Sequence, residues 1–453
     1  MTQFAQVKGP IPGPRSRALV EREALLAPGI QSISSLAGIA VDHGKGAVLV
    51  DVDGNQFIDF VAGICVSSIG HGHPALRDAL AAQAGKLSAG SFATEARAQL
   101  LERIAGLTSK IGTGSLRRTQ FYSGGAEAVE SALRLARAHT KKYEVIAFYG
   151  GFHGKTGGVL GLMGSTFKQG LGPTAQMAGQ YLAPFPDSYK LGKDPAVAGA
   201  EAIESLRRLI ELQTTGSLAA ILVEPIQGTN GNVIPPAGFL KAVKEVAREH
   251  GALLILDEMI TGWGRTGKMF GQEHEGVEAD IMTFGKGVGN GFPVTGLVTT
   301  DAIVNSADPW SRPSFSSSSY GGSPLAMAAA NAVTRTILDE KMADNAARVG
   351  EVMLGALQKL KTKYSFIGDV RGKGLLLALE LVADRQTRTP LDKKSCETIF
   401  RGCLERGLLT MAYAPRVRIN PPLCITQEQA LEGIQILDEA FAEFSRKNDR
   451  SQA

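Results

Sequence analysis

Short apolar runs alternate with helical segments through the middle of this chain of 453 residues, and that alternation limits the folds open to it. Strand-like runs are expected at 144–149, 218–226, 252–260 and 280–284. Between two of these runs, Pro236 stands near the first turn of a helix and Gly251 ends that helix. An apolar stripe predicts an earlier helix over 126–140. Strand–helix–strand repetition is typical of an α/β fold, in which helices cover a mostly parallel sheet and ligands bind beyond the carboxyl ends of its strands.

The chain is too long for one small core and suits a large α/β domain with a smaller domain beside it. Alternating residues over 48–60, around an Asp-Gly turn, predict a β-hairpin near the amino terminus. A long helical stretch after about 335 leads to an apolar run and then to further helices. We therefore expect an N-terminal arm and part of the small domain over 1–70, a large cofactor-binding domain over 71–334, and the rest of the small domain over 335–453.

Composition excludes several classes of protein. A net charge of +4 without a run of Lys and Arg argues against nucleic-acid binding. The four cysteines form no CxxC pair and have no histidine at metal-ligand spacing, so reduced, mostly buried thiols and no metal site are expected. We see no signal peptide and no run of roughly 20 apolar residues that could span a membrane. The expected location is the cytoplasm.

A lysine and an aspartate each follow an apolar strand-like run. Asp257 follows Leu253-Leu-Ile-Leu, and Lys286 lies between glycines that leave space for a cofactor. Either residue alone would be interpreted as a surface residue, but two strands of one sheet can deliver both to the same cleft. There the lysine can form a Schiff base with an aldehyde cofactor and carry a proton, while the carboxylate keeps the cofactor's ring nitrogen protonated. The pair predicts a pyridoxal-phosphate enzyme.

The segment Ser123-Gly-Gly-Ala126 opens the helix predicted at 126. Amide N–H groups at a helix start bind anions, and glycines let a phosphate approach the backbone. Taken alone, the segment is a tight turn between a strand and a helix. Beside Asp257 and Lys286, we interpret it as a phosphate site.

Two further segments carry candidate contacts. Phe152 follows a strand-like run, and its ring can stack on a cofactor ring for ~1 kcal/mol, although a lone aromatic is more often a core residue. His153 beside it is expected as a supporting residue and not as a proton carrier. Arg418 has a planar guanidinium that suits a substrate carboxylate, and it suits a structural acid equally well. Local sequence leaves both interpretations of Arg418 open.

Together these segments resemble the class III aminotransferases, which are fold-type I pyridoxal-phosphate enzymes, from about Val41 to Phe444. The most specific motif is Leu256-Asp-Glu-Met-Ile-Thr-Gly-Trp-Gly-Arg-Thr-Gly, followed at the family's spacing by the lysine-bearing strand. The resemblance implies a mostly parallel, seven-stranded-type sheet in the large domain, a smaller α+β domain, and pyridoxal 5'-phosphate as the cofactor. It also implies that Lys286 is the Schiff-base lysine and Asp257 the acid at the pyridine nitrogen.

Other positions match cofactor contacts of the family. Gly125 and Ala126 match its phosphate-binding turn, and Phe152, with His153 next to it, matches the ring-stacking aromatic. Met259 stands on the opposite ring face, where a valine or alanine is usual. Ser319 falls where the family usually has a threonine that reaches the phosphate of the neighbouring subunit. This match implies a homodimer, or a tetramer built from it.

The resemblance also assigns substrate contacts. Arg418 matches the carboxylate-binding arginine, and Glu224 matches the acid that hides this arginine in ω-aminotransferases while an amine without an α-carboxylate is bound. Lys155 stands where 4-aminobutyrate aminotransferases have an arginine for the distal carboxylate. Ile64 matches aminobutyrate-type transaminases, whereas dialkylglycine decarboxylases have a glutamine there.

The predicted reaction is amino transfer from an ω-amino acid or a related amine, such as 4-aminobutyrate, to pyruvate or 2-oxoglutarate by a ping-pong mechanism. The alternatives are a racemase or epimerase that uses the same cofactor, a decarboxylase of the dialkylglycine type, and a non-catalytic binding protein. Arg418 favours transfer over racemisation, because racemases of this branch can lack that arginine. Asp257 and Lys286 together argue against a non-catalytic role.

Overall fold

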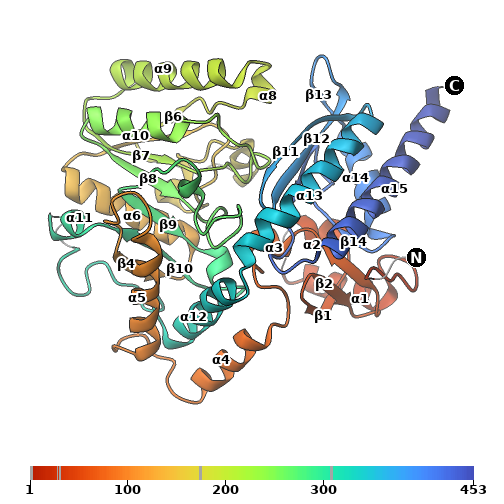
Figure 1. Cartoon of the computed structure of the whole chain (residues 1–453), viewed down its shortest axis with the longest axis horizontal. Coiled ribbons are helices and arrows are strands. Elements are labelled where there is room, and N and C mark those ends of the chain that lie inside the picture. Colours follow the sequence, from red (N-terminus) through yellow and green to blue (C-terminus); the bar gives the residue numbers. More distant parts are fainter. Residues whose placement is uncertain (1–3, 28, 30–31, 173–175, 307–309, 453) are drawn as a thin grey trace. The chain divides into compact units, whose positions relative to one another are not determined.

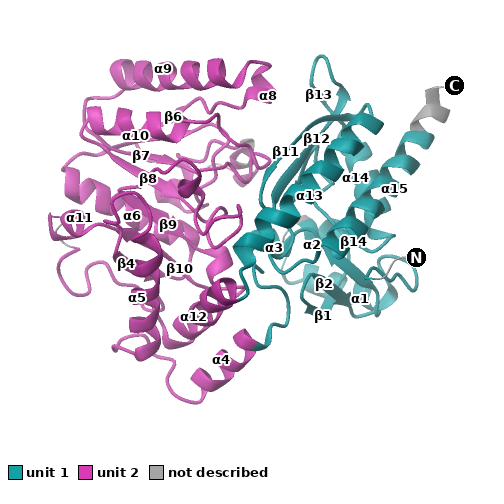
Figure 2. Ribbon diagram, viewed as in Figure 1, with its two compact units in different colours: residues 1–74, 340–453 teal, residues 75–339 magenta. Residues whose placement is uncertain are grey.

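The structure is a computed structural model that describes residues 4–27, 29, 32–172, 176–306 and 310–452 (Figure 1). It divides into two compact units, coloured separately in Figure 2. Unit 1 contains Met1–Pro74 and Glu340–Ala453, and unit 2 contains Ala75–Asp339. The sequence puts the corresponding boundaries at 70/71 and 334/335. Each unit is described by itself below.

Unit 2 is built on a seven-stranded sheet of order β4-β10-β9-β8-β7-β5-β6. Its strands are β4 (Arg118–Tyr122), β5 (Glu144–Phe148), β6 (Gln180–Ala183), β7 (Leu218–Val223), β8 (Leu253–Asp257), β9 (Ile281–Phe284) and β10 (Thr295–Thr299). The pairs of β5 with β6 and β7, of β7 with β8, and of β8 with β9 are parallel, while β10 is antiparallel to both β9 and β4. The mostly parallel α/β sheet expected from the sequence is therefore confirmed.

Helix α6 (Gly125–Thr140) lies against this sheet and supplies much of its core. Val129, Leu133 and Ala136 are buried, as the apolar stripe predicts, and they pack in one cluster with residues of β5, β7, β8, β9 and β10. Helix α10 (Phe239–Glu249) contacts β7 and β8 and fills the segment between Pro236 and Gly251. The other helices of this part of the chain are α4 (Pro74–Ala84), α5 (Glu95–Thr108), α7 (Gly157–Leu160), η1 (Thr166–Leu171), α8 (Ser188–Leu191), α9 (Pro195–Gln213), η2 (Gly271–His274), η3 (Lys286–Val288), α11 (Asp301–Ser306) and α12 (Pro324–Asp339).

Unit 1 contains two small sheets. The first joins β1 (Val41–Lys45), β2 (Val48–Asp51), β3 (Gln56–Asp59) and β14 (Leu408–Leu409); the second joins β11 (Ile367–Lys373), β12 (Leu376–Asp384), β13 (Thr389–Pro390) and β15 (Arg416–Ile419). The predicted hairpin is confirmed, because β2 and β3 pair antiparallel on either side of the Asp-Gly turn. The helices are α1 (Pro14–Ala24), α2 (Ser32–Ala37), α3 (Ala62–Cys65), α13 (Met342–Lys363), α14 (Lys393–Leu404) and α15 (Gln427–Gln452).

The long helical stretch predicted after about 335 is confirmed as α13, and a separate helix that was not predicted, α12, precedes it and begins at Pro324. Proline is favoured at the first helical position because its missing N–H has no acceptor there. The Ser323 hydroxyl accepts the amide of Ala326 at 3.4 Å and completes the start of α12. The Ser-Pro pair therefore marks the beginning of α12.

The short segment α3 is a left-handed turn. Ala62, Gly63, Ile64 and Cys65 have φ values of +49°, +60°, +65° and +64°. Three of these residues carry a Cβ, so the turn costs roughly 1–2 kcal/mol for each of them. Asp59, the last residue of β3, holds its start: Oδ1 accepts the amides of Val61 at 2.8 Å and Ala62 at 2.9 Å. Oδ2 of Asp59 lies 2.8 Å from Nε2 of His71, so the predicted substrate residue Ile64 sits in a strained but well-anchored segment.

All four cysteines are free, and Cys65, Cys396 and Cys403 are buried, in agreement with the expected thiols. Burial raises the pKa of Cys396 and Cys403 to about 12, so neither thiol ionises near neutral pH. Within the described ranges, the helices include none with the length and apolar character needed to cross a membrane.

Candidate functional site

Asp257 ends strand β8 and is 3% exposed. Three donors of the described residues reach its carboxylate: Nδ1 of His153 lies 2.8 Å from Oδ2, while the Thr283 hydroxyl at 3.1 Å and the Met259 amide at 3.2 Å donate to Oδ1. A carboxylate offers about four acceptor positions. These contacts therefore fill Oδ1 and leave one position on Oδ2 for a further donor.

Burial by itself would raise the pKa of Asp257. The hydrogen bond and charge of His153, the positive charge of Lys286 and the Met259 amide outweigh burial and hold this pKa below its ordinary value. Asp257 is thus a fixed negative charge at the carboxyl end of the sheet.

Lys286 follows strand β9, the neighbour of β8, and opens the short helix η3. Its φ is +46°, a left-handed conformation that is unfavourable for a residue with a Cβ. Gly285 before it leaves no room for a side chain, since a Cβ there would lie 2.6 Å from Sδ of Met259. Strained backbone of this kind persists where its surroundings hold it, often at functional sites.

Two glycines bring the predicted phosphate turn together with the rest of the site. A Cβ at Gly125 would lie 3.6 Å from Sδ of Met259, so the start of α6 faces the residue two positions after Asp257. Gly154, at φ +130°, approaches Ala126 so closely that a Cβ there would lie 2.5 Å from the Ala126 Cβ. Glu127 accepts the amides of Ser123 at 3.1 Å and Gly124 at 3.3 Å. The amides of Gly125 and Ala126 come next, in the helical turn whose N–H groups have no intrahelical acceptor.

Glu224 lies just beyond β7 and is buried. Its Oε1 accepts the Phe152 amide at 3.0 Å, and its Oε2 accepts the Gly228 amide at 2.9 Å. Burial, and with it the negative charge of Asp257, raises the pKa of Glu224, while the charge of His153 and the two amides oppose this shift. The acid is thereby tied to the segment that carries Phe152.

The remaining predicted residues lie elsewhere. The side chains of Lys155 and Ser319 belong to unit 2 and are exposed. Ile64 and Arg418 belong to unit 1, where Ile64 lies in the left-handed turn and Arg418 on β15. In unit 2, the contacts above connect Asp257 to His153 and Met259, and Met259 to Gly125 and Gly285, while Glu224 holds Phe152. Ser319 makes none of these contacts.

The sequence analysis missed two donors to this arrangement, Thr283 and Gly228, and a buried acid next to Asp257 in sequence, Glu258. Thr283 donates to Asp257 from the opposite strand, and Gly228 donates to Glu224. Glu258 is buried with its carboxylate bound to the amides of Gly271 and Gln272, each at 2.8 Å, and to the Thr261 hydroxyl. Thr283 could have been noticed in the sequence, because it is a polar residue inside the apolar run Ile281–Phe284 and lies three residues before Lys286.

These residues fit a phosphorylated aldehyde of a protonated pyridine. Oδ2 of Asp257 keeps one acceptor position for a ring N–H, Lys286 supplies an amine, and the Gly125–Ala126 turn supplies amide donors for a phosphate. Gly125 and Gly285 both approach Met259 closely, the residue that the resemblance places on one face of the ring.

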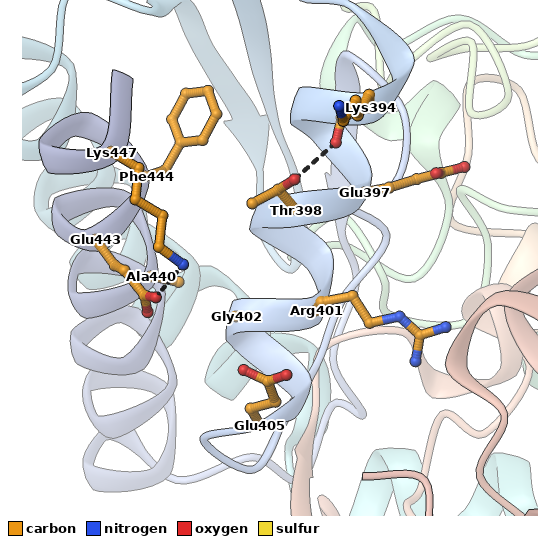
Figure 3. A pocket seen from close by; sticks show the side chains of 10 residues that line it. All are labelled: Lys394, Glu397, Thr398, Arg401, Gly402, Glu405, Ala440, Glu443, Phe444 and Lys447. Atoms are coloured by element: carbon orange, nitrogen blue, oxygen red, sulfur yellow. Dashed lines mark hydrogen bonds and ion pairs between the residues drawn. The ribbon is translucent and has the colours of Figure 1, made fainter. Parts of the chain in front are cut away.

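A separate hollow of about 320 Å³ lies in unit 1 between α14 and α15 (Figure 3). Its charged side chains include Lys394, Arg401, Glu405 and the paired Glu443 and Lys447. None of the residues predicted for the site lines it. The chemistry predicted from the sequence therefore does not extend to this surface.

Comparison with known proteins agrees with this geometry. The family model for aminotransferase class-III matches residues 31–441. The chain is 35% identical over 440 residues to 5-aminovalerate aminotransferase of Pseudomonas putida, covering 95% of this chain and 99% of that protein. It is 32% identical to alanine/serine racemase of Pyrococcus horikoshii, covering 95% of this chain and 91% of the racemase. The crystal structure of an amine transaminase from an uncultivated Pseudomonas species, in its PLP-bound form, matches with a TM-score of 0.85 at 32% identity, covering 89% of this chain and 95% of that one.

Proposed function

The chain belongs to the pyridoxal-phosphate-dependent class III aminotransferases, and from that premise we propose that it transfers the amino group of an ω-amino acid or a related amine to a 2-oxo acid. The relative from Pseudomonas putida is named for 5-aminovalerate, an ω-amino acid, which supports this class of donor. Pyruvate and 2-oxoglutarate are the proposed acceptors.

The cofactor, when bound, supplies an aldehyde carbon that takes up amines and a ring that accepts electrons. Lys286 would hold the cofactor through its Nζ, and the same nitrogen would move a proton during the reaction. Asp257 is proposed to accept the ring N–H at Oδ2, where its depressed pKa keeps it ionised. Gly125 and Ala126 are proposed to donate to the phosphate, with Phe152 and Met259 contacting the two ring faces.

The observation that carries the choice of substrate is the position of Glu224. It is a buried acid held by two amides, one of which belongs to Phe152, so it is an immobile acceptor next to the proposed ring-binding residue. An acid fixed in this way suits the role that the resemblance gives it, which is to engage Arg418 while an ω-amino donor without an α-carboxylate reacts. Arg418 is then available for the carboxylate of the 2-oxo acid in the second half of the reaction.

A homodimer is part of this proposal. In unit 2, Phe92, Phe315 and Tyr320 expose 65%, 58% and 77% of their surface, more than large aromatic side chains usually leave to water. Arg97 connects the segments around Phe92 and Tyr320. Its side chain donates to the carbonyl oxygen of Gly90 at 3.0 Å, and its Cδ would lie 3.2 Å from a Cβ added at Gly322. An aromatic surface next to Ser319 supports contact with a second copy of this chain.

A donor panel tests the proposed substrates. 4-Aminobutyrate, 5-aminovalerate and 1-phenylethylamine are each mixed with the loaded enzyme, and loss of the visible cofactor band is followed before pyruvate or 2-oxoglutarate is added. The proposal expects bleaching by the ω-amino acids and recovery of the band with a 2-oxo acid. Lys286→Ala should abolish turnover, and the mass increase left by borohydride reduction of the loaded enzyme should disappear.

The similarity to the alanine/serine racemase makes racemisation the competing function. Single-enantiomer alanine or serine is incubated with the enzyme without any 2-oxo acid, and the product is analysed by chiral chromatography. Inversion of configuration without net loss of amino groups would replace the proposed amino transfer. Unchanged enantiomeric purity, with transfer once pyruvate is added, supports it.

A further inference from the structure

One face of the sheet formed by β11, β12 and β15 in unit 1 carries a cluster of charged side chains. Residues directly opposite each other in antiparallel strands share a face. One row across the three strands contains Asp369, Glu380 and Arg416, and the next row contains Arg371, Ala378 and Arg418. The face therefore holds three guanidinium groups and two carboxylates, which leaves an excess of positive charge.

Glu380 is the central acid of this face, and both of its oxygens are occupied. NH2 of Arg371 lies 2.8 Å from Oε2, and Nε of Arg416 lies 3.0 Å from Oε1. Arg371 also donates to Asp369 at 2.9 Å, and Lys361 lies 3.9 Å from the other oxygen of Asp369. Glu380 is 8% exposed, so this network is largely removed from water.

Arg418 lies diagonal to Glu380 across β12 and β15, as Arg371 does across β11 and β12. Both arginines lie opposite Ala378, two residues from Glu380, and such diagonal neighbours are within reach of long side chains. Arg416 stands directly opposite Glu380 and occupies the oxygen on the β15 side. Among the described residues of unit 1, no carboxylate forms an ion pair with Arg418.

We propose that Arg416 and Arg371 are positioning residues that saturate Glu380 and thereby keep Arg418 available for a substrate carboxylate. This inference rests on the proposed function, in which Arg418 binds the 2-oxo acid. A buried carboxylate with an unpaired oxygen is costly, so loss of the Arg416 charge leaves Glu380 to recruit the next guanidinium within reach. That guanidinium is Arg418, and its recruitment competes with the substrate.

The main test is Arg416→Gln, which removes the charge and keeps a side chain of similar length. The expected result is a rise of about tenfold in KM for pyruvate, the effect of one charged hydrogen bond, with kcat within about twofold of the parent enzyme. The inhibition constant of acetate, a carboxylate with no reacting group, should rise in parallel. A merely structural role for Arg416 would lower kcat or the melting temperature without this selective loss of carboxylate binding.

Two further variants keep the test decisive. Arg416→Lys preserves a cation opposite Glu380 and should stay within about twofold of the parent KM, because a single ammonium can still pair with Oε1. The double variant Arg416→Gln/Glu380→Gln removes the competing acid as well, so the KM for pyruvate should return towards the parent value. A double variant that is as impaired as Arg416→Gln would overturn the proposal, as would an Arg416→Lys enzyme with a tenfold higher KM.

Arg406→Gln is the matched control. The Arg406 side chain is 29% exposed against 28% for Arg416, and it also pairs with a glutamate, Glu443, at 2.7 Å. Its kinetics should equal those of the parent. Arg418→Ala separates the two levels of the argument: an unchanged KM for pyruvate in that variant would refute the proposed role of Arg418. A raised KM in Arg418→Ala together with an unchanged KM in Arg416→Gln would refute the positioning role alone.

Discussion

At the scale of single residues, Asp257 shows how a buried charge is held by its neighbours. The hydroxyl of Thr283 donates to Oδ1 from the adjacent strand and is completely buried. We expect Thr283→Val, which keeps the shape and removes the donor, to weaken cofactor binding by up to about tenfold, because one hydrogen bond to a charged group is worth roughly 1.5 kcal/mol. Titration of the apoenzyme with pyridoxal phosphate measures this change. Thr283→Ser restores the donor and should bind the cofactor like the parent; equal weakening in both variants would show that the hydroxyl is irrelevant.

Glu258, next to Asp257 in sequence, has the opposite electrostatics. Burial raises its pKa to about 7, although the Thr261 hydroxyl and the amides of Gln272 and Gly271 oppose that shift. The folded protein therefore binds a proton more readily than the unfolded chain, and the contribution of Glu258 to stability falls as pH rises from about 4.5 to about 7. The fall is at most about 1.4 kcal/mol per pH unit from this group.

We therefore expect the melting temperature of Glu258→Gln, followed from pH 5 to pH 8, to lose less on going from pH 5 to pH 7 than that of the parent. Towards pH 8 the two curves should become parallel, because Glu258 is then mostly ionised in the folded chain and fully ionised in the unfolded chain. Parallel curves over the whole range would mean that Glu258 keeps an ordinary pKa. Glu273→Gln, which alters the nearby acid that also raises this pKa, should reduce the slope only slightly.

The ionisable residues of the site could be predicted from the sequence, whereas their hydrogen-bond partners could not. Asp257, Lys286 and Glu224 stand in motifs with a recognisable spacing. The contacts of Thr283 and Gly228 depend on the register between strands and on the path of a loop, since Thr283 faces Asp257 only because β8 and β9 pair in that register. Arg418 shows the same limit, because the occupancy of Glu380 follows from the pairing of the consecutive strands β11 and β12 with β15, which comes much later in the chain.

At the scale of elements, the left-handed turn α3 is the least expected feature. Gly63→Ala places a Cβ at φ +60°, where its nearest neighbour outside the adjacent residues would be Val66 at an ordinary 3.5 Å, so the change adds backbone strain without a clash. Gly355→Ala is the matched variant, an exposed helical glycine in α13 with no atom within 4 Å of the added methyl. Both changes stiffen the unfolded chain equally.

We expect Gly63→Ala to destabilise the protein and Gly355→Ala to stabilise it, with a gap of about 1.5–2 kcal/mol in unfolding free energy. Denaturant unfolding followed by circular dichroism measures the gap. Equal effects of the two substitutions would show that α3 relaxes into a right-handed turn. If the turn presents Ile64 to the substrate, as the resemblance to class III aminotransferases implies, Gly63→Ala should also raise the KM of the amine donor.

Periodicity predicted β5, β7, β8 and β9 and the helices α6 and α10, because the sheet of unit 2 is buried and its strands are continuous apolar runs. Strands β4, β6 and β10 were not predicted. The same logic missed the start of α12, which is set by the local chemistry of Ser323 and Pro324. It also gave no sign that β10 runs antiparallel to its two neighbours, since a buried strand has the same composition in either direction. The turn at α3 was missed because three of its four residues are not glycine, and sequence patterns assign positive φ mainly to glycine.

At the scale of the whole molecule, the proposed homodimer makes a direct prediction. Phe92→Glu places a charge on the exposed aromatic surface around Phe92 and Tyr320, and we expect it to shift the protein from dimer to monomer with loss of activity. Light scattering coupled to size-exclusion chromatography measures the mass. Leu212→Glu is the matched control, because Leu212 on α9 is also 65% exposed and lies on a different element. If the Phe92→Glu variant remains a dimer with full activity, the dimer interface does not include the surface around Phe92.

Unit 1 is assembled from both ends of the sequence, and this bears on how the protein is made. The backbone amide of Phe4 donates to Glu432, 428 positions away, and the short strand β14 completes the edge of β3. During synthesis on the ribosome, unit 2 emerges complete while the first seventy or so residues still lack their partners. The edge of the early hairpin at β3 therefore stays unpaired until the late segments, which include β14, leave the exit tunnel. A chain truncated near residue 400 would contain a complete unit 2 and an incomplete unit 1 with an unpaired strand edge. Such a form is suited to recognition by chaperones and proteases.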